Sequence, residues 1–151
     1  MTKDGKYEGD GSFCTAAIDG DDVVVRGVRC TWFGGANDPD DSGETASGVS
    51  TKRNPNFLGC ALPMWGKEPA CKGSPFKYFP WHTLVRVYNR QTGAAVVTEL
   101  IDVGPAKRKD GAQQGCIDLT QAAMRKICGG MRPSEAVVDF RVIGGAKYMG
   151  K

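Results

Sequence analysis

The segment LIDVGPAKRKDGAQQGCIDLT, residues 100–120, places an aspartate at the end of each of two short apolar runs. Asp102 ends LID, Asp118 ends CID, and a glycine- and lysine-rich loop separates them. A carboxyl group behind apolar neighbours is partly removed from water, and a second carboxylate nearby disfavours ionising both. The segment therefore predicts two buried strands that bring together carboxyl groups able to hold a proton near neutral pH.

The composition is that of one ordinary globular domain. The chain has 151 residues, of which 40% are hydrophobic and 25% are charged. Its 21 glycines and 8 prolines favour a loop-rich, mostly β architecture over a helical bundle. We find no internal repeat and no linker. We therefore expect a single domain over residues 1–151, with 1–20 as a polar N-terminal extension and the β structure over about 22–145.

The charge distribution and the hydropathy narrow the range of partners. The net charge is +3, and the lysines and arginines form no long stripe, so we expect no nucleic-acid partner. A weakly anionic partner such as a cell-wall polymer is compatible with this charge. No apolar run approaches the roughly 20 residues that cross a bilayer, so we expect no membrane span. We also expect a monomer.

The six cysteines indicate in which cellular compartment the protein is found. They are scattered, none lies in a CxxC pair, and the chain has one histidine, which argues against a zinc site. Scattered cysteines in a small glycine-rich chain favour disulfides and a secreted or periplasmic protein whose signal peptide is absent from this sequence. Buried thiols in a cytosolic protein remain the alternative. Pairing of sequence neighbours is one of many connectivities: Cys14 with Cys30, Cys60 with Cys71, and Cys116 with Cys128.

Alternating and β-branched patterns predict the strands, and Pro63 ends one of them. In TLVRVYNRQTG, Val85 and Val87 are expected on one face, and NRQTG supplies a hairpin turn. Long polar loops are expected over 36–56 and 65–81. About six short strands predict a small closed β-barrel. The main predicted strand segments are 21–35, 57–64, 83–93, 94–104 and 135–145.

The segment DLTQAAMRKICGG, residues 118–130, predicts a short helix that ends at Gly129. Either Asp118 or Thr120 is suited to cap its N-terminus. The sequence thus leaves two roles open for Asp118, a helix cap and a catalytic acid. Asp102 likewise is either a turn residue before a Gly-Pro pair or a part of the site.

An ordered set of short motifs resembles a known superfamily. CTWFGG, TASG, ALP, HTLVRVYNRQTG, IDVGP and IDLTQAA occur in this order over about residues 29–143. The set is similar to the rare lipoprotein A-like and expansin-like domains of the double-psi β-barrel superfamily, and more distantly to family 45 glycoside hydrolases. The resemblance implies a mostly β fold: a six-stranded double-psi β-barrel with one short helix and long polar loops.

The resemblance also implies a function and a site. It implies a groove for a cell-wall polysaccharide, either peptidoglycan or a cellulose-like glycan, lined by Thr31, Asp102 and Asp118. Asp118 would be the general acid of a lytic transglycosylase or glycoside hydrolase, and Asp102 would position it and shift its pKa. No cofactor is implied. The chain departs from the family's motifs at Val49, His82 and Val103, and a non-catalytic, expansin-like glycan-binding domain remains open.

Other side chains complete the candidate site. Trp65, Trp81 and Tyr78 lie in a proline-rich loop and are candidates for stacking on sugar faces. Hydrolysis requires a second acidic group, for which Glu44 is a further candidate. A protein-binding module, such as a protease inhibitor or a barwin-like defence protein, is another alternative, with the loop 65–81 as its contact. We expect no metal site, because the acidic segment 37–44 lacks the EF-hand pattern.

Overall fold

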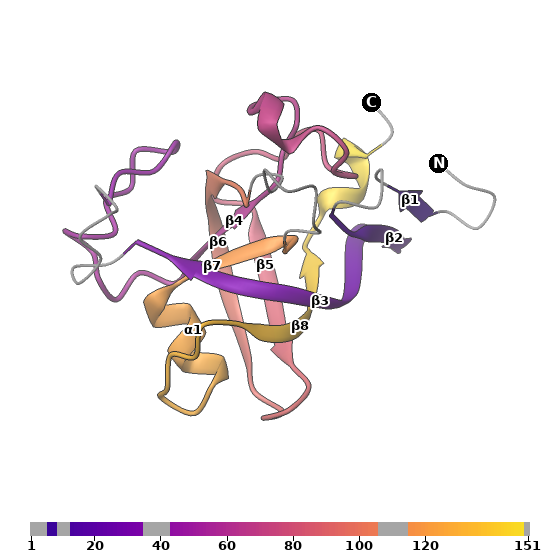
Figure 1. Cartoon of the computed structure of the whole chain (residues 1–151). Helices are drawn as coiled ribbons and strands as arrows, with labels where there is room; N and C mark the ends of the chain where they lie inside the picture. The colour runs from indigo at the N-terminus through magenta and orange to yellow at the C-terminus, as the bar shows by residue number, and fades with distance from the viewer. Residues whose placement is uncertain (1–5, 9–12, 35–42, 106–114, 150–151) are drawn as a thin grey trace.

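The computed structural model describes residues 6–8, 13–34, 43–105 and 115–149 (Figure 1). Most of the acidic segment 37–44 and the whole basic segment 106–111 lie outside these residues. The described part holds eight strands and one α-helix. The strands are β1 (Lys6–Glu8), β2 (Thr15–Asp19), β3 (Asp22–Phe33), β4 (Gly59–Leu62), β5 (Leu84–Asn89), β6 (Ala95–Val103), β7 (Ile117–Thr120) and β8 (Ala136–Val142). The helix is α1 (Gln121–Ile127), and two short 3-10 helices are η1 (Pro69–Cys71) and η2 (Gly145–Tyr148).

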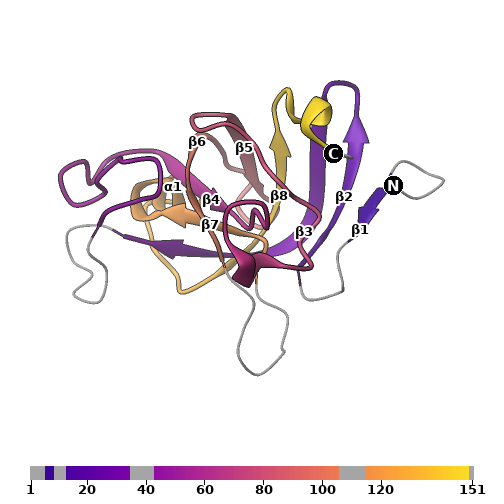
Figure 2. The same ribbon diagram turned by 90° about the horizontal axis from the view of Figure 1, so that it is seen from above.

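Six of the strands form a closed barrel. They follow the order β3, β7, β4, β6, β5, β8, and a pairing between β8 and β3 closes the ring (Figures 1 and 2). The pairs β3–β7 and β4–β6 are parallel, and the other pairs in the ring are antiparallel. The predicted class is confirmed: a mostly β chain that forms a closed six-stranded mixed barrel with one short helix in the described part.

The long strand β3 pairs with three neighbours. Its first residues pair with β2, most of its length pairs with β8, and its last four residues pair with β7. The register with β8 shifts between Val25 and Val28, where Gly27 has a φ of 66° and donates its N–H to Asp139. A bulge of this kind bends a strand. The bend lets one strand serve both sides of the ring.

The barrel interior is filled by alternate residues of the strands. Val85 and Val87 of β5 are completely buried, whereas Leu84 and Arg86 are exposed, as the alternation predicts. The loop 65–81 is more than a polar connection, because Phe76 and Phe79 are completely buried. Each fully buried side chain of this size contributes about 1.5–3 kcal/mol to folding.

The helix is shorter than predicted and begins later. Thr120 is its N-cap and accepts a hydrogen bond from the N–H of Ala123, while Asp118 lies two residues earlier in β7. A helix-capping role for Asp118 is therefore wrong. The predicted end is close to that observed, since α1 ends at Ile127, two residues before Gly129.

The N-terminal segment departs from the prediction. Part of the expected polar extension forms β1 and β2, an antiparallel pair that adds to the sheet beside β3 (Figure 2). Phe13 and Ala16 of this segment are buried in the core. The strand was missed because TAAID is short and half polar, so its alternation is weak.

The cysteines also depart from the prediction. The described residues contain one disulfide, Cys14–Cys116, so the pairing of sequence neighbours is wrong. Cys14 precedes β2 and Cys116 precedes β7, and both of these strands pair with β3. The barrel thus joins cysteines that are far apart in sequence. The remaining thiols, three of them buried, are Cys30, Cys60, Cys71 and Cys128.

Candidate functional site

Strand register places the predicted site residues in one row. Thr31 of β3 lies opposite Asp118 of β7, Asp118 lies opposite Ala61 of β4, and Ala61 lies opposite Asp102 of β6. Cross-strand partners share a face of the sheet. Because Cys30, next to Thr31, is completely buried in the interior, the row lies on the outer face. We call Thr31, Asp118, Ala61 and Asp102 the acid row.

Asp118 is partly buried and accepts a hydrogen bond from the hydroxyl of Thr31. The pKa of Asp118 is raised from 3.8 to about 6, because burial and the negative charge of Asp102 together outweigh the opposing effects of the Thr31 hydrogen bond and the charge of Arg29. Near neutral pH this carboxyl group exists in both its protonated and its ionised forms. A carboxylic acid of this kind can donate a proton to a substrate.

Asp102 is held by the backbone. Its Oδ1 accepts hydrogen bonds from the N–H of Ala46 at 3.1 Å and from the N–H of Val103 at 2.9 Å. Two strand spacings separate Asp102 from Asp118 in the row, which puts their Cα atoms about 10 Å apart. Asp102 therefore acts on Asp118 through its charge. It also fastens the segment TASG to the barrel, aided by a hydrogen bond from Ser47 N to Ile101 O.

Glu44 belongs to the same fastened segment. It is exposed, and its carboxylate lies 3.6 Å from the guanidinium of Arg53. It stands two residues before Ala46, whose N–H binds Asp102. Glu44 is therefore linked to Asp102 through the chain, by way of Ala46.

The predicted aromatic residues gather around two lysines. Lys67 Nζ lies 5.1 Å from the ring centroid of Tyr78 and 4.8 Å from that of Trp81, and Lys77 Nζ lies 5.4 Å from that of Trp65. Trp65 is 42% exposed and Tyr78 is 41% exposed. Large exposed rings beside cations are available to a ligand. We call Trp65, Lys67, Lys77, Tyr78 and Trp81 the aromatic cluster.

The loop that carries the aromatic cluster contacts the segment that follows β6. The Sγ of Cys71, in the loop that carries the cluster, lies 3.9 Å from Pro105 O, and Gly104 N donates to Leu62 O. Pro105 is three residues beyond Asp102. The loop 65–81 is therefore packed against the end of the strand that carries Asp102.

His82 and Trp32 each contact a charged side chain. His82 is exposed, has a φ of 66°, and its Nδ1 lies 3.0 Å from a Glu99 carboxylate oxygen. Trp32 is partly buried against the core, with the guanidinium of Arg132 at 4.0 Å from its ring centroid. Trp32 therefore packs against the core, and His82 pairs with Glu99 at the surface.

Sequence reasoning missed Ala61 and Arg29. Ala61 stands between the two aspartates of the acid row and is buried, with 2% of its surface exposed. Arg29 lowers the pKa of Asp118 and also pairs with Glu135 at 2.5 Å. Alternation along ALP gives the face of Ala61, but the register that sets it beside Asp118 has no local signal.

The fold and the acid row define the class: a small closed mixed β-barrel with a proton-holding carboxyl group on its outer face. No protein-family model matches the chain, and no curated protein matches it. Among the described residues, no group of three or more His, Cys, Asp or Glu side chains is arranged to hold a metal ion. Within that same part of the chain, no helix has the length and apolar character needed to cross a membrane.

Proposed function

We propose that this barrel belongs to the double-psi superfamily, resembles its rare lipoprotein A-like and expansin-like domains, and binds a cell-wall polysaccharide. Asp118 is the general acid that cleaves the glycan, as in a lytic transglycosylase or a glycoside hydrolase. One observation carries the proposal: a partly buried carboxyl group, hydrogen-bonded to Thr31, has its pKa raised to about 6.

Cleavage begins with a proton transfer. Protonated Asp118 donates its proton to the glycosidic oxygen as the bond from that oxygen to the anomeric carbon breaks. Thr31 orients the carboxyl group through its hydroxyl. The charge of Asp102 disfavours ionisation of Asp118 before the substrate is bound. The leaving sugar then departs as a neutral alcohol.

The attacking group distinguishes two versions of the reaction. In hydrolysis, a water attacks the anomeric carbon and a second carboxylate removes its proton. In lytic cleavage, a hydroxyl of the same sugar attacks the anomeric carbon and forms an anhydro ring, and Asp118, ionised by its first proton transfer, takes up the proton of that hydroxyl. A single catalytic carboxyl group therefore suffices. Two backbone N–H groups hold Asp102 in place through its Oδ1 in either version. Glu44 is the candidate base for hydrolysis.

Two observations bear on the alternatives. A non-catalytic, expansin-like domain would use the same acid row and aromatic cluster to bind glycan without cleaving it. The exposed rings of Trp65 and Tyr78 would also serve a protein-binding module. The disulfide that was expected to pin that loop is missing, because Cys60 and Cys71 are buried thiols.

The disulfide Cys14–Cys116 supports secretion or a periplasmic location.

The test is digestion of purified peptidoglycan and of cellulose by the wild type, Asp118→Asn and a control, Asp21→Asn. Asp21 is exposed and lies outside the acid row. Mass spectrometry of released sugars distinguishes anhydro ends, which mean lytic cleavage, from reducing ends, which mean hydrolysis. We expect release by the wild type and Asp21→Asn, and none by Asp118→Asn.

Other results would change the conclusion. Equal release by Asp118→Asn removes Asp118 from the mechanism. Binding to sedimented cell wall without release of soluble sugar by any protein favours the non-catalytic alternative. Stoichiometric inhibition of a cysteine protease, with no binding to glycan, favours the protein-binding alternative.

A further inference from the structure

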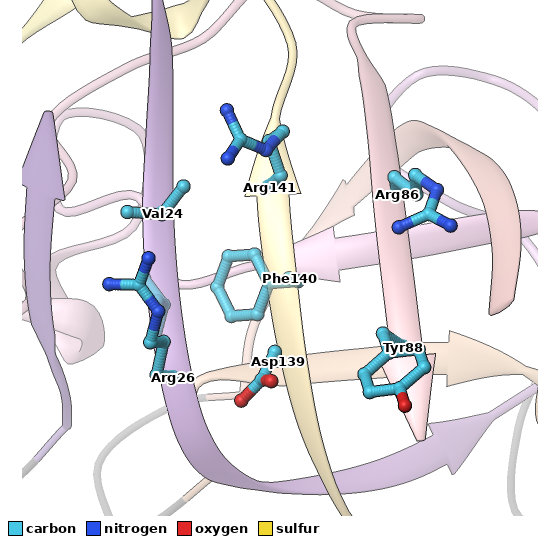
Figure 3. A pocket seen from close by; sticks show the side chains of 8 residues that line it. Val24, Arg26, Arg86, Tyr88, Asp139, Phe140 and Arg141 are labelled. Carbon is cyan, nitrogen blue, oxygen red and sulfur yellow. The ribbon is translucent and has the colours of Figure 1, made fainter. Parts of the chain in front are cut away.

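A hollow on the outer face of β3, β8 and β5 carries three arginines (Figure 3). Its volume is about 190 Å³, and the side chains that matter here are Val24, Arg26, Arg86, Tyr88, Asp139 and Arg141. We propose that this arginine hollow binds an oxyanion, a carboxylate or a phosphate, carried on a single sugar ring. It is a second site, and the proposal stands whether or not the acid row cleaves glycan.

Strand register builds the hollow. Arg141 of β8 lies opposite Val24 of β3 on one side and opposite Arg86 of β5 on the other. In the next outward-facing row, Asp139 lies opposite Tyr88. Figure 3 shows the guanidinium groups spread over three neighbouring strands, with Tyr88 and Asp139 below Arg86 and Arg141. The strands β8 and β5 take no part in the acid row, so the two sites lie on different parts of the ring.

Two charges in the hollow are already neutralised. Arg141 binds Asp22 at 3.0 Å and Asp19 at 2.6 Å. Asp139 receives two contacts from Arg90, at 2.8 and 2.9 Å, and the N–H of Gly27. The surrounding carboxylates are therefore engaged by these partners.

The other two arginines supply an excess of positive charge. Arg26 acts on Asp139 through its charge alone, and neither Arg26 nor Arg86 forms an ion pair with another residue of the described ranges. Arg86 lies directly opposite Arg141, whose charge is already engaged by Asp19 and Asp22. The positive charge left for a bound anion is therefore that of Arg26 and Arg86.

The chemistry of the lining selects the ligand. A guanidinium presents a planar fork of N–H donors that matches a carboxylate or a phosphate. Tyr88 is partly buried and offers a ring face and a hydroxyl beside the arginines. The hollow, with a volume of about 190 Å³, has room for one ring with its acidic group.

The test is a titration followed by amide NMR shifts at low ionic strength, where charge effects are not screened. The probes are glucuronate, glucose 6-phosphate, inorganic phosphate and neutral glucose. The proteins are the wild type, Arg26→Gln, Arg86→Gln and a matched control, Arg125→Gln, which removes an exposed arginine from α1. Circular dichroism checks that each variant is folded.

We expect an acidic sugar to shift amides of β3, β8 and β5, and neutral glucose to shift none. Each of Arg26→Gln and Arg86→Gln weakens that binding about tenfold or more, while Arg125→Gln binds as the wild type does. Comparison of glucuronate with glucose 6-phosphate identifies the preferred oxyanion. Absence of binding by every acidic probe overturns the proposal, as does wild-type affinity in both Arg26→Gln and Arg86→Gln. Equal affinity for inorganic phosphate and glucose 6-phosphate overturns the role given to the sugar ring.

Discussion

We expect Asp118→Asn to stabilise the fold at neutral pH. The pKa of Asp118 is raised from 3.8 to about 6, chiefly by burial. Each tenfold change in proton affinity corresponds to about 1.4 kcal/mol, so the ionised side chain costs the folded state about 3 kcal/mol. Asparagine carries no charge and retains an oxygen for the Thr31 hydroxyl, so the variant escapes this cost.

The effect has a defined pH dependence. Because the native state holds the Asp118 proton more tightly than the unfolded chain does, wild-type stability falls as pH rises from about 4 to about 6. The advantage of Asp118→Asn is therefore near zero at pH 4, grows up to pH 6 and is constant above pH 7. Urea unfolding at several pH values measures it, and 3 kcal/mol corresponds to a midpoint shift of about 1–3 M.

A second variant serves as the control of opposite sign. The pKa of Asp22 is lowered by the backbone N–H of Gly144 and by Arg141. Asp22→Asn therefore loses stability above the unfolded pKa of the carboxyl group, and this loss disappears as pH falls. The reasoning about Asp118 is refuted if Asp118→Asn is no more stable than the wild type at pH 7 while Asp22→Asn behaves as stated.

Four further outcomes are expected. The rate of glycan release falls above about pH 6 as Asp118 ionises. In the wild type the Thr31 hydrogen bond favours the ionised form of Asp118, so Thr31→Val raises the pKa of Asp118 and moves the fall in rate to higher pH. A pH–rate profile checks both outcomes. Thr120→Ala removes the helix cap and lowers the free energy of unfolding by about 1–2 kcal/mol, measured by urea unfolding. Cys14→Ser opens a disulfide that spans 102 residues and costs about 2–5 kcal/mol, measured as a lower thermal midpoint, and peptide mapping checks the bond to Cys116 in the wild type.

The sequence predicted the barrel because its strands carry strong local patterns. Val85 and Val87 alternate with polar residues, and β3 is a run of β-branched residues before Gly34. The short strand β2 has neither feature, so it was missed. The disulfide was also missed, because Cys14 and Cys116 meet only through the pairing of β2 and β7 with β3.

Of the candidate site, too, the sequence indicated one part and missed another. Asp102 and Asp118 stand out because each ends an apolar run, and the structure sets them on one face. Which of two neighbouring residues caps the helix depends on where β7 ends, and the sequence left that open. The arginine hollow had no signal at all. Arg26, Arg86 and Arg141 are scattered over more than a hundred residues and meet only through register.

A ring of strands has no first or last member. In the part of the chain that the structure describes, the outermost strand is β1, which is three residues long. Unpaired strand edges are the templates on which chains join into aggregates. Because β3 and β8 close the barrel, the unpaired strand edge in the described part is that of the short strand β1. We therefore expect the folded protein to resist aggregation by strand pairing in concentrated solution.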